Sequence, residues 1–148
     1  MIDLEVLALP NGLSIEPSLV SAGQPDGAGY ARAYANGIRH VVNLRPAAET
    51  PSFDSRAAAE ACGLNYLSIP IAGIGDLNRA NVEVLDGWIA GVAPATVLVH
   101  CGSGARVCAL LALRAHWLYG ATAEQALAIA ARAGTTPLLG ALRQLMGG

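Results

Sequence analysis

Short runs of β-branched and long apolar residues recur along the chain, and the stretches between them carry apolar residues at helical spacing. A short, continuously apolar run is typical of a strand buried on both faces, whereas recurrence every three or four residues is typical of a helix with one buried face. The pattern therefore predicts strands that alternate with helices. The expected strands cover residues 19–22, 38–44, 64–69 and 96–100.

Residues that begin and end helices lie between these strands. Asp, Asn, Ser and Thr can accept hydrogen bonds from the free amides of a first helical turn, and Gly often follows the last turn. Strands that alternate with helices predict an α/β fold with a mostly parallel central sheet and helices on both faces. The expected helices cover 27–36 after Asp26, a segment from Ser52 or Asp54 to Cys62, about 79–90 after Asn78, an Ala- and Leu-rich segment after the last strand, about 123–133 after Thr122, and a short last helix with Pro137 in its first turn.

Length and composition fit one domain over residues 1–148. Hydrophobic residues make up 53% of the chain and charged residues 14%, so burial can offset the entropy lost on folding. No linker or internal repeat divides the sequence. All nine basic residues are Arg, which excludes a lysine Schiff base and a lysine-rich surface for nucleic acid. We therefore expect no nucleic-acid partner.

Membrane and secretory signals are also missing from the sequence pattern. Asp3 and Glu5 stand where a signal peptide needs basic residues. The apolar stretch 107–119 contains Arg114 and His116 and is shorter than the roughly 20 residues that span a bilayer. The three cysteines have no CxxC spacing, so neither a disulfide framework nor a metal site is expected. We expect a cytoplasmic protein without a membrane partner, a metal or a cofactor.

The residues that suggest chemistry directly follow the last predicted strand. Cys101 is followed by small residues and then by Arg106 in the first turn of a helix. Gly102 and Gly104 permit backbone angles that let successive amides point at one centre. A helix N-terminus adds partial positive charge, and an Arg can hold two oxygens of one oxyanion. This order predicts an anion-binding loop with a sulfur at its base.

The same surroundings favour the thiolate form of Cys101. The helix dipole, the converging amides and the Arg106 guanidinium all stabilise negative charge on the sulfur, which makes it a nucleophile toward an electrophile that carries negative oxygens. In the alternative interpretation, Cys101 is a buried residue on a glycine turn and Arg106 only caps its surroundings. The order of strand, Cys, glycines, Arg and helix favours the first interpretation.

The segment 100–107 resembles the signature of the bacterial tyrosine-phosphatase-like proteins related to the beta-lactamase-hydrolase-like proteins, within the superfamily of cysteine phosphatases and dual-specificity phosphatases. Segments 21–25, 41–46 and 64–71 are similar to that family in the same order and with similar spacing. The resemblance covers about residues 18–134, which we take as the core of the domain. It implies a cysteine-phosphatase-like fold.

The resemblance also implies a reaction on a phosphorylated substrate or a small oxyanion. Cys101 would attack phosphorus and form a thiophosphate, and water would then release phosphate. Arg106 and the loop would bind the oxygens, and His100 would organise the loop instead of acting as a base. The implied enzyme is a phosphatase of the tyrosine or dual-specificity type. Its substrate-binding loop consists of Gly102, Ser103, Gly104 and Ala105.

Two departures from ordinary tyrosine phosphatases favour slower turnover or a different electrophile. Only four residues separate Cys101 from Arg106, whereas those enzymes have five, so one amide donor is lost and the ring is tighter. Rhodanese-type sulfurtransferases resemble this shorter loop, which in them cradles a persulfide. Val107 also stands where phosphatases usually have a Ser or Thr that assists release of the phosphoenzyme.

The general acid and a second anion contact are assigned from loop positions. Asp76 lies in a glycine-containing loop after the third predicted strand and could protonate a leaving oxygen, or it could instead make a turn or cap the helix after Asn78. Arg45 ends the second predicted strand and could point into the same site, or it could be a surface Arg before Pro46.

Three hypotheses follow for the function. The first is a cysteine-dependent hydrolase of phosphomonoesters, and the second is a rhodanese-type sulfurtransferase that carries a Cys101 persulfide. The third is a non-catalytic anion-binding module that uses the same amides. The high apolar fraction of the chain is compatible with a homodimer under any of the three.

Overall fold

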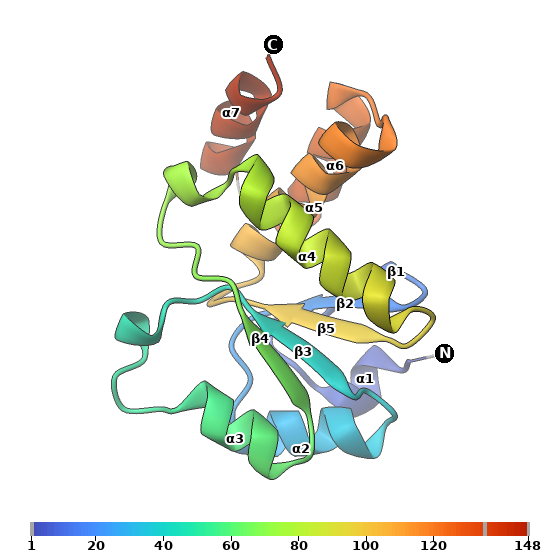
Figure 1. Ribbon diagram of the computed structural model, residues 1–148, viewed down its shortest axis with the longest axis vertical. Helices are drawn as coiled ribbons and strands as arrows, with labels where there is room; N and C mark the ends of the chain where they lie inside the picture. Colours follow the sequence, from blue (N-terminus) through green and yellow to red (C-terminus); the bar gives the residue numbers. More distant parts are fainter. Residues whose placement is uncertain (1, 135, 148) are drawn as a thin grey trace.

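A five-stranded sheet lies at the centre of the structure, a computed structural model that describes residues 2–134 and 136–147 (Figure 1). The strand order is β1-β2-β5-β3-β4, with β1 antiparallel to β2 and all other neighbours parallel. The strands are Leu13–Glu16 (β1), Leu19–Ala22 (β2), His40–Asn43 (β3), Asn65–Ser68 (β4) and Val97–His100 (β5).

Helices cover both faces of the sheet, as the alternation of strands and helices predicts (Figure 1). α1, α2 and α3 pack on one face, and α4 to α7 pack on the other. Two short 3-10 helices, η1 and η2, lie in the loops after β3 and β4. The helices are Leu4–Leu7 (α1), Gly27–Ala35 (α2), Ala47–Glu49 (η1), Ser55–Ala61 (α3), Ile74–Asp76 (η2), Arg79–Val92 (α4), Ala105–Tyr119 (α5), Ala123–Ala131 (α6) and Thr136–Leu145 (α7).

The predicted helix starts are confirmed by side chains that accept hydrogen bonds from the first turn. Asp26 accepts from the Gly29 amide at 2.7 Å. The side chains of Asp54 and Asn78 cap α3 and α4 in the same way. Thr122 forms the expected capping box with the side chain of the third helical residue. These caps fix where each helix begins because they satisfy amides that have no partner inside the helix.

The pattern predicts four of the five strands, but it does not predict β1 or α1. Both elements are only four residues long, and β1 alternates between half-buried and exposed positions at the edge of the sheet. So short an alternation carries little periodic signal. The buried strands were predictable because β2 and β5 are apolar at three of their four positions and β3 has two consecutive valines at its centre.

The register of the parallel strands decides where the site lies. Ala22 of β2 and Asn43 of β3 both lie opposite His100 of β5. The residues that follow these three strands therefore meet at one edge of the sheet. Sheets of this kind bind ligands beyond the carboxyl ends of their parallel strands. Cys101 and Arg45 are both brought to this edge.

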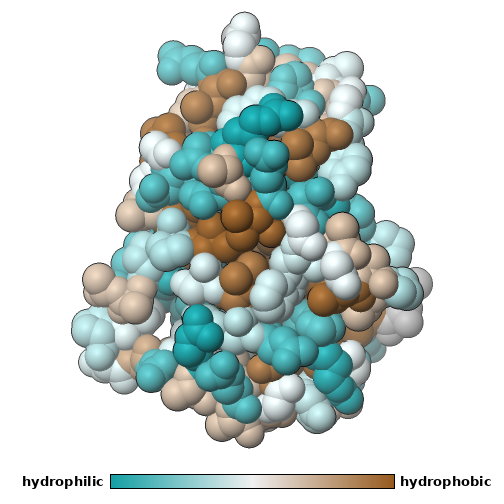
Figure 2. Space-filling model, in the orientation of Figure 1, coloured by the Kyte–Doolittle hydropathy of each residue, from teal (hydrophilic) through white to brown (hydrophobic). Residues whose placement is uncertain are grey.

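The surface gives two further findings. On the face in Figure 2, hydrophobic and hydrophilic residues are interspersed, with a hydrophobic group near its centre. None of the helices in the described parts of the chain has the length and apolar character needed to cross a bilayer. The homodimer stays a prediction.

Candidate active site

The loop after β5 holds the Cys101 thiol in a fixed position. The Cys101 side chain is fully buried, and its Sγ accepts a hydrogen bond from the Gly104 amide at 3.1 Å. Gly104 has φ +95°, a conformation that glycine adopts easily and that turns this amide back toward the sulfur. α5 begins at the next residue, so the thiol also lies at the positive end of a 15-residue helix. Both effects favour negative charge on the sulfur.

Residues from the N-terminal part of the chain hold the outside of this loop. The Gln24 amide donates to the Gly102 carbonyl at 3.1 Å, and Asn11 Nδ2 donates to the Ser103 carbonyl at 3.0 Å. The contact at Gly23 is so close that a Cβ there would lie 2.7 Å from the Gly102 oxygen. Glycine is therefore required at position 23 for the loop to pack against the segment after β2.

Arg106 keeps one side of its guanidinium available for a ligand. Nη1 and Nη2 donate to the two carboxylate oxygens of Glu49, each at 3.0 Å, and Nη1 also donates to the Ile71 carbonyl at 2.9 Å. These bonds use three of the five N–H groups. The Nε hydrogen and the second Nη2 hydrogen remain, and this pair forms a fork that matches two oxygens of an oxyanion. Glu49 and the nearby Cys101 raise the pKa of Arg106, Glu49 more strongly.

Glu49 is a functional candidate that the sequence analysis did not find. It lies at the end of η1 and joins two arginines, because its Oε1 also accepts from Arg45 Nε at 3.2 Å. The hydrogen bond from Arg106 is the main cause that lowers the pKa of Glu49. The only sequence signal is an acidic residue four positions after Arg45, which has meaning only if that segment turns as a helix does.

Arg45 follows β3 and lies beside the loop that contains Cys101. A Cβ at Gly102 would lie 3.7 Å from Arg45 Nε. The Arg45 amide donates to Asn43 Oδ1 at 2.8 Å, which fixes the backbone where β3 ends. Arg45 is thus beside the loop, while its contact with a substrate stays a prediction.

His100 supports the loop from the buried side of β5. Its Nε2 lies 2.8 Å from the hydroxyl of Tyr30, and both side chains are fully buried. Nδ1 lies near the backbone of Cys101 but has no hydrogen-bond partner within the described residues. Burial lowers the pKa of His100 to about 3 and raises that of Tyr30 to about 12. A neutral, enclosed imidazole fits a structural role and not that of a base.

The lowered pKa of His100 makes stability depend on pH. The unfolded chain binds a proton on this residue as pH falls below 6.5, whereas the folded chain excludes it down to about pH 3. The free energy of unfolding should therefore fall between these values, with no contribution from His100 above pH 6.5. From about pH 7.5 to about pH 5 we expect the wild type to lose about 2 kcal/mol more than His100→Gln in urea unfolding. Equal losses would contradict the assignment.

Asp76 lies on a loop that contacts the site, but its carboxylate faces its own backbone. Oδ2 accepts from the Ala72 amide at 2.9 Å and from the Gly73 amide at 3.4 Å. The loop reaches the site through Ile71, whose carbonyl accepts from Arg106. The turn-forming role that the sequence analysis weighed for Asp76 is present in the structure. The role as general acid stays a prediction and requires the side chain to leave these two amides.

Val107 offers no hydroxyl to the site. It is fully buried in the core on the α4 to α7 face of the sheet. The sulfur of Cys108, the next residue, lies 3.8 Å from the hydroxyl oxygen of Ser21. Burial raises the pKa of the Cys108 thiol. Of these two neighbouring cysteines, it is Cys101 whose sulfur accepts a hydrogen bond from a backbone amide of the loop.

Comparison with known proteins supports the resemblance found in the sequence. A family model described as "Beta-lactamase hydrolase-like protein, phosphatase-like domain" matches residues 13–116. The Beta-lactamase hydrolase-like protein of Xylella fastidiosa (strain Temecula1 / ATCC 700964) is 33% identical over 105 residues, which cover 68% of this chain and 24% of the relative. The chain therefore spans about a quarter of the length of the curated relatives it matches.

Solved structures share the fold over nearly the whole chain. A candidate phosphatase from Shewanella putrefaciens CN-32 has a TM-score of 0.74 at 21% identity and covers 97% of this chain and 96% of its own. TpbA of P. aeruginosa, solved in complex with pTyr, has a TM-score of 0.70 at 18% identity, with 100% of this chain and 87% of its own covered. These matches do not favour the rhodanese alternative. The family model and the relatives show that the chain belongs to the family of the phosphatase-like domain of beta-lactamase hydrolase-like proteins.

Proposed function

We propose that the protein is a cysteine-dependent phosphatase that hydrolyses phosphomonoesters through a thiophosphate on Cys101. The observation that carries the proposal is the pairing of a buried sulfur, held by the Gly104 amide, with the unused fork of Arg106. Within the described residues, the backbone amides of Gly102, Ser103 and Ala105 donate to no other protein group. They are therefore available to the oxygens of a bound phosphate.

The reaction would proceed in two displacements. Cys101 Sγ attacks phosphorus, the S–P bond forms, and the bond from phosphorus to the leaving oxygen breaks. The Arg106 fork and the free amides hold the non-bridging oxygens, whose charge they stabilise in the transition state. Asp76, the proposed general acid, gives its proton to the leaving oxygen in this step. Water then attacks phosphorus and gives a proton to the Asp76 carboxylate, the S–P bond breaks, inorganic phosphate is released and the thiolate is restored.

We propose that the reaction at Cys101 is the one that tyrosine and dual-specificity phosphatases catalyse. It is supported by the shared fold and by TpbA, whose structure was solved with pTyr. Because the chain corresponds to only about a quarter of its curated relatives, the substrate has to be inferred from the site itself.

Steady-state assays distinguish the three hypotheses. We expect the purified chain to release p-nitrophenol from p-nitrophenyl phosphate and to form no thiocyanate from thiosulfate and cyanide. Thiocyanate formation without phosphatase activity would instead identify a sulfurtransferase. If neither activity is found and Cys101 does not react with iodoacetate at neutral pH, the chain is an anion-binding module.

Replacing Asp76 by Asn tests the general acid. The amide oxygen that Asp76→Asn introduces can still accept from the Ala72 amide, so the loop keeps its turn while the acidic proton is lost. We expect kcat/KM to fall about 100-fold for an alkyl phosphate. The fall should be much smaller for p-nitrophenyl phosphate, because p-nitrophenolate leaves without protonation. An equal effect on both esters, or none, would assign Asp76 to the turn alone.

A further inference from the structure

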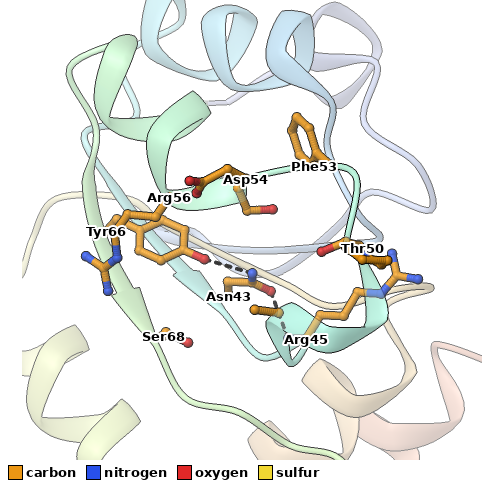
Figure 3. A pocket seen from close by; sticks show the side chains of 11 residues that line it. Asn43, Arg45, Thr50, Phe53, Asp54, Arg56, Tyr66 and Ser68 are labelled. Carbon is orange, nitrogen blue, oxygen red and sulfur yellow. Dashed lines mark hydrogen bonds between the residues drawn. The ribbon is translucent and has the colours of Figure 1, made fainter.

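A cavity of about 410 Å³ is lined by residues from β3, η1, α3 and β4 and from the loops that connect them (Figure 3). Arg45 lines this cavity and also approaches Gly102 of the loop. η1 forms a second shared wall, because its Ala47 lines the cavity while its Glu49 binds Arg106. The group attached to a phosphate in the loop can therefore extend past Arg45 into the cavity.

Eight of the eleven residues that line the cavity have side chains that can form hydrogen bonds, and the other three are Ala47, Pro51 and Phe53. Asn43 Nδ2 donates to the Tyr66 hydroxyl at 2.8 Å, which leaves the phenolic proton free to donate (Figure 3). Within residues 2–134 and 136–147, the hydroxyls of Thr50 and Ser68 have no hydrogen-bond partner.

The two aromatic residues of the cavity do not form an open slot for another ring. Phe53 and Tyr66 both pack against the core on the α1 to α3 face of the sheet. The Arg56 guanidinium lies 4.7 Å from the centre of the Tyr66 ring and covers one side of it. The Tyr66 hydroxyl is held by Asn43. The Tyr66 ring therefore offers a phosphotyrosine ring at most one free side for stacking.

We infer that the cavity binds the leaving group of the substrate, and that this group is small and rich in hydroxyls, as in a sugar or a polyol. The inference rests on the proposed phosphatase reaction and specifies its substrate class. The volume lies at the small end of the range for small-molecule sites, which suits one such unit. The hydroxyls of the leaving group would then form hydrogen bonds with the hydroxyls of Thr50 and Ser68. An aryl group would leave these two protein hydroxyls without a partner in the substrate.

The experiment compares esters on the full chain by release of inorganic phosphate. The panel contains p-nitrophenyl phosphate, phosphotyrosine, glycerol phosphate and glucose 6-phosphate. We expect kcat/KM for the best hydroxyl-rich ester to exceed that for phosphotyrosine by about 10-fold or more, the effect of one or two well-placed hydrogen bonds. A preference for phosphotyrosine over every hydroxyl-rich ester would overturn the inference and leave the proposed reaction intact.

Variants then connect the preference to the cavity. Thr50→Val and Ser68→Ala remove one hydroxyl each, and we expect kcat/KM for the best hydroxyl-rich ester, relative to that for p-nitrophenyl phosphate, to fall about 5-fold to 10-fold for each. Arg56→Gln removes a cavity cation and its pair with Glu60. Arg143→Gln is the matched control, because it breaks the exposed pair with Glu124 far from the cavity residues.

The outcomes separate the two claims. If the ratio falls for Thr50→Val and Ser68→Ala but not for Arg143→Gln, the cavity binds the leaving group. If the ratio is unchanged in every cavity variant, the cavity is not the leaving-group site. If the wild type hydrolyses none of the esters, including p-nitrophenyl phosphate, the proposed function fails and the inference fails with it.

Discussion

Replacing Cys101 by Ser is expected to reduce kcat for p-nitrophenyl phosphate by more than about 1000-fold. The serine hydroxyl is not ionised at neutral pH, and His100 is too weak a base to take its proton, because burial lowers the pKa of His100 to about 3. The fold should persist, because serine has nearly the same size and can accept the bond from the Gly104 amide. Phosphate release measures the rate, and circular dichroism measures the fold.

Cys108→Ser is the matched control for this variant. Cys108 is also fully buried and lies close in sequence, but its thiol contacts Ser21 and not the loop amides. We expect its kcat to stay within about threefold of the wild type, whatever small change in stability accompanies the buried substitution. Full activity in Cys101→Ser, or equal losses in both variants, would exclude Cys101 as the nucleophile.

Replacing Arg106 by Lys is expected to lower kcat/KM by about 1000-fold, although the positive charge is kept. An ammonium group cannot offer a two-hydrogen fork to a phosphate while also binding both oxygens of Glu49 and the Ile71 carbonyl. The variant therefore loses the two hydrogen bonds that stabilise the transition state. It also loses the contacts that hold the positive charge in place. Steady-state kinetics with p-nitrophenyl phosphate measure the effect.

Two further variants interpret this loss. Glu49→Gln keeps the shape of the side chain but removes the charge that holds Arg106, so we expect kcat/KM to fall about 10-fold. In the double variant with Arg106→Lys, the loss of kcat/KM should be smaller than the two single losses combined, because both residues act through the same ion pair. Arg114→Lys is the control, because Arg114 is also held by ion pairs but lies outside the loop. Its partners are Asp86 and Glu16. If Arg106→Lys is no more harmful than Arg114→Lys, the oxyanion role is wrong.

The parts of the site that are local in sequence could be predicted from it. The order of Cys101, glycines and Arg106 between a strand and a helix dictates a loop whose amides, helix end and guanidinium act on one sulfur. The helix caps were predictable for the same reason, because each depends on one side chain and the amides two or three residues later. The central sheet followed from continuously apolar runs, which only burial on both faces explains.

The parts that depend on contacts between distant segments could not be predicted. Glu49 binds Arg106 from 57 positions earlier in the chain, and Tyr30 meets His100 from 70 positions earlier. No periodicity encodes such pairs. The direction of the Asp76 side chain was equally open, because Asp in a glycine-containing loop can bind nearby amides or face a ligand, and here it binds Ala72. The cavity beside Arg45 also requires the folded arrangement of β3, β4 and α3.

The most direct test of the account is to identify the covalent species on Cys101 during turnover. The protein is mixed with p-nitrophenyl phosphate, quenched rapidly and digested, and its peptides are measured by mass spectrometry. We predict that the peptide containing Cys101 gains the mass of one phosphoryl group, and that this gain is absent without substrate. Turnover with an unmodified Cys101 peptide, or with the phosphoryl group on another residue, would contradict the role of Cys101 as the nucleophile.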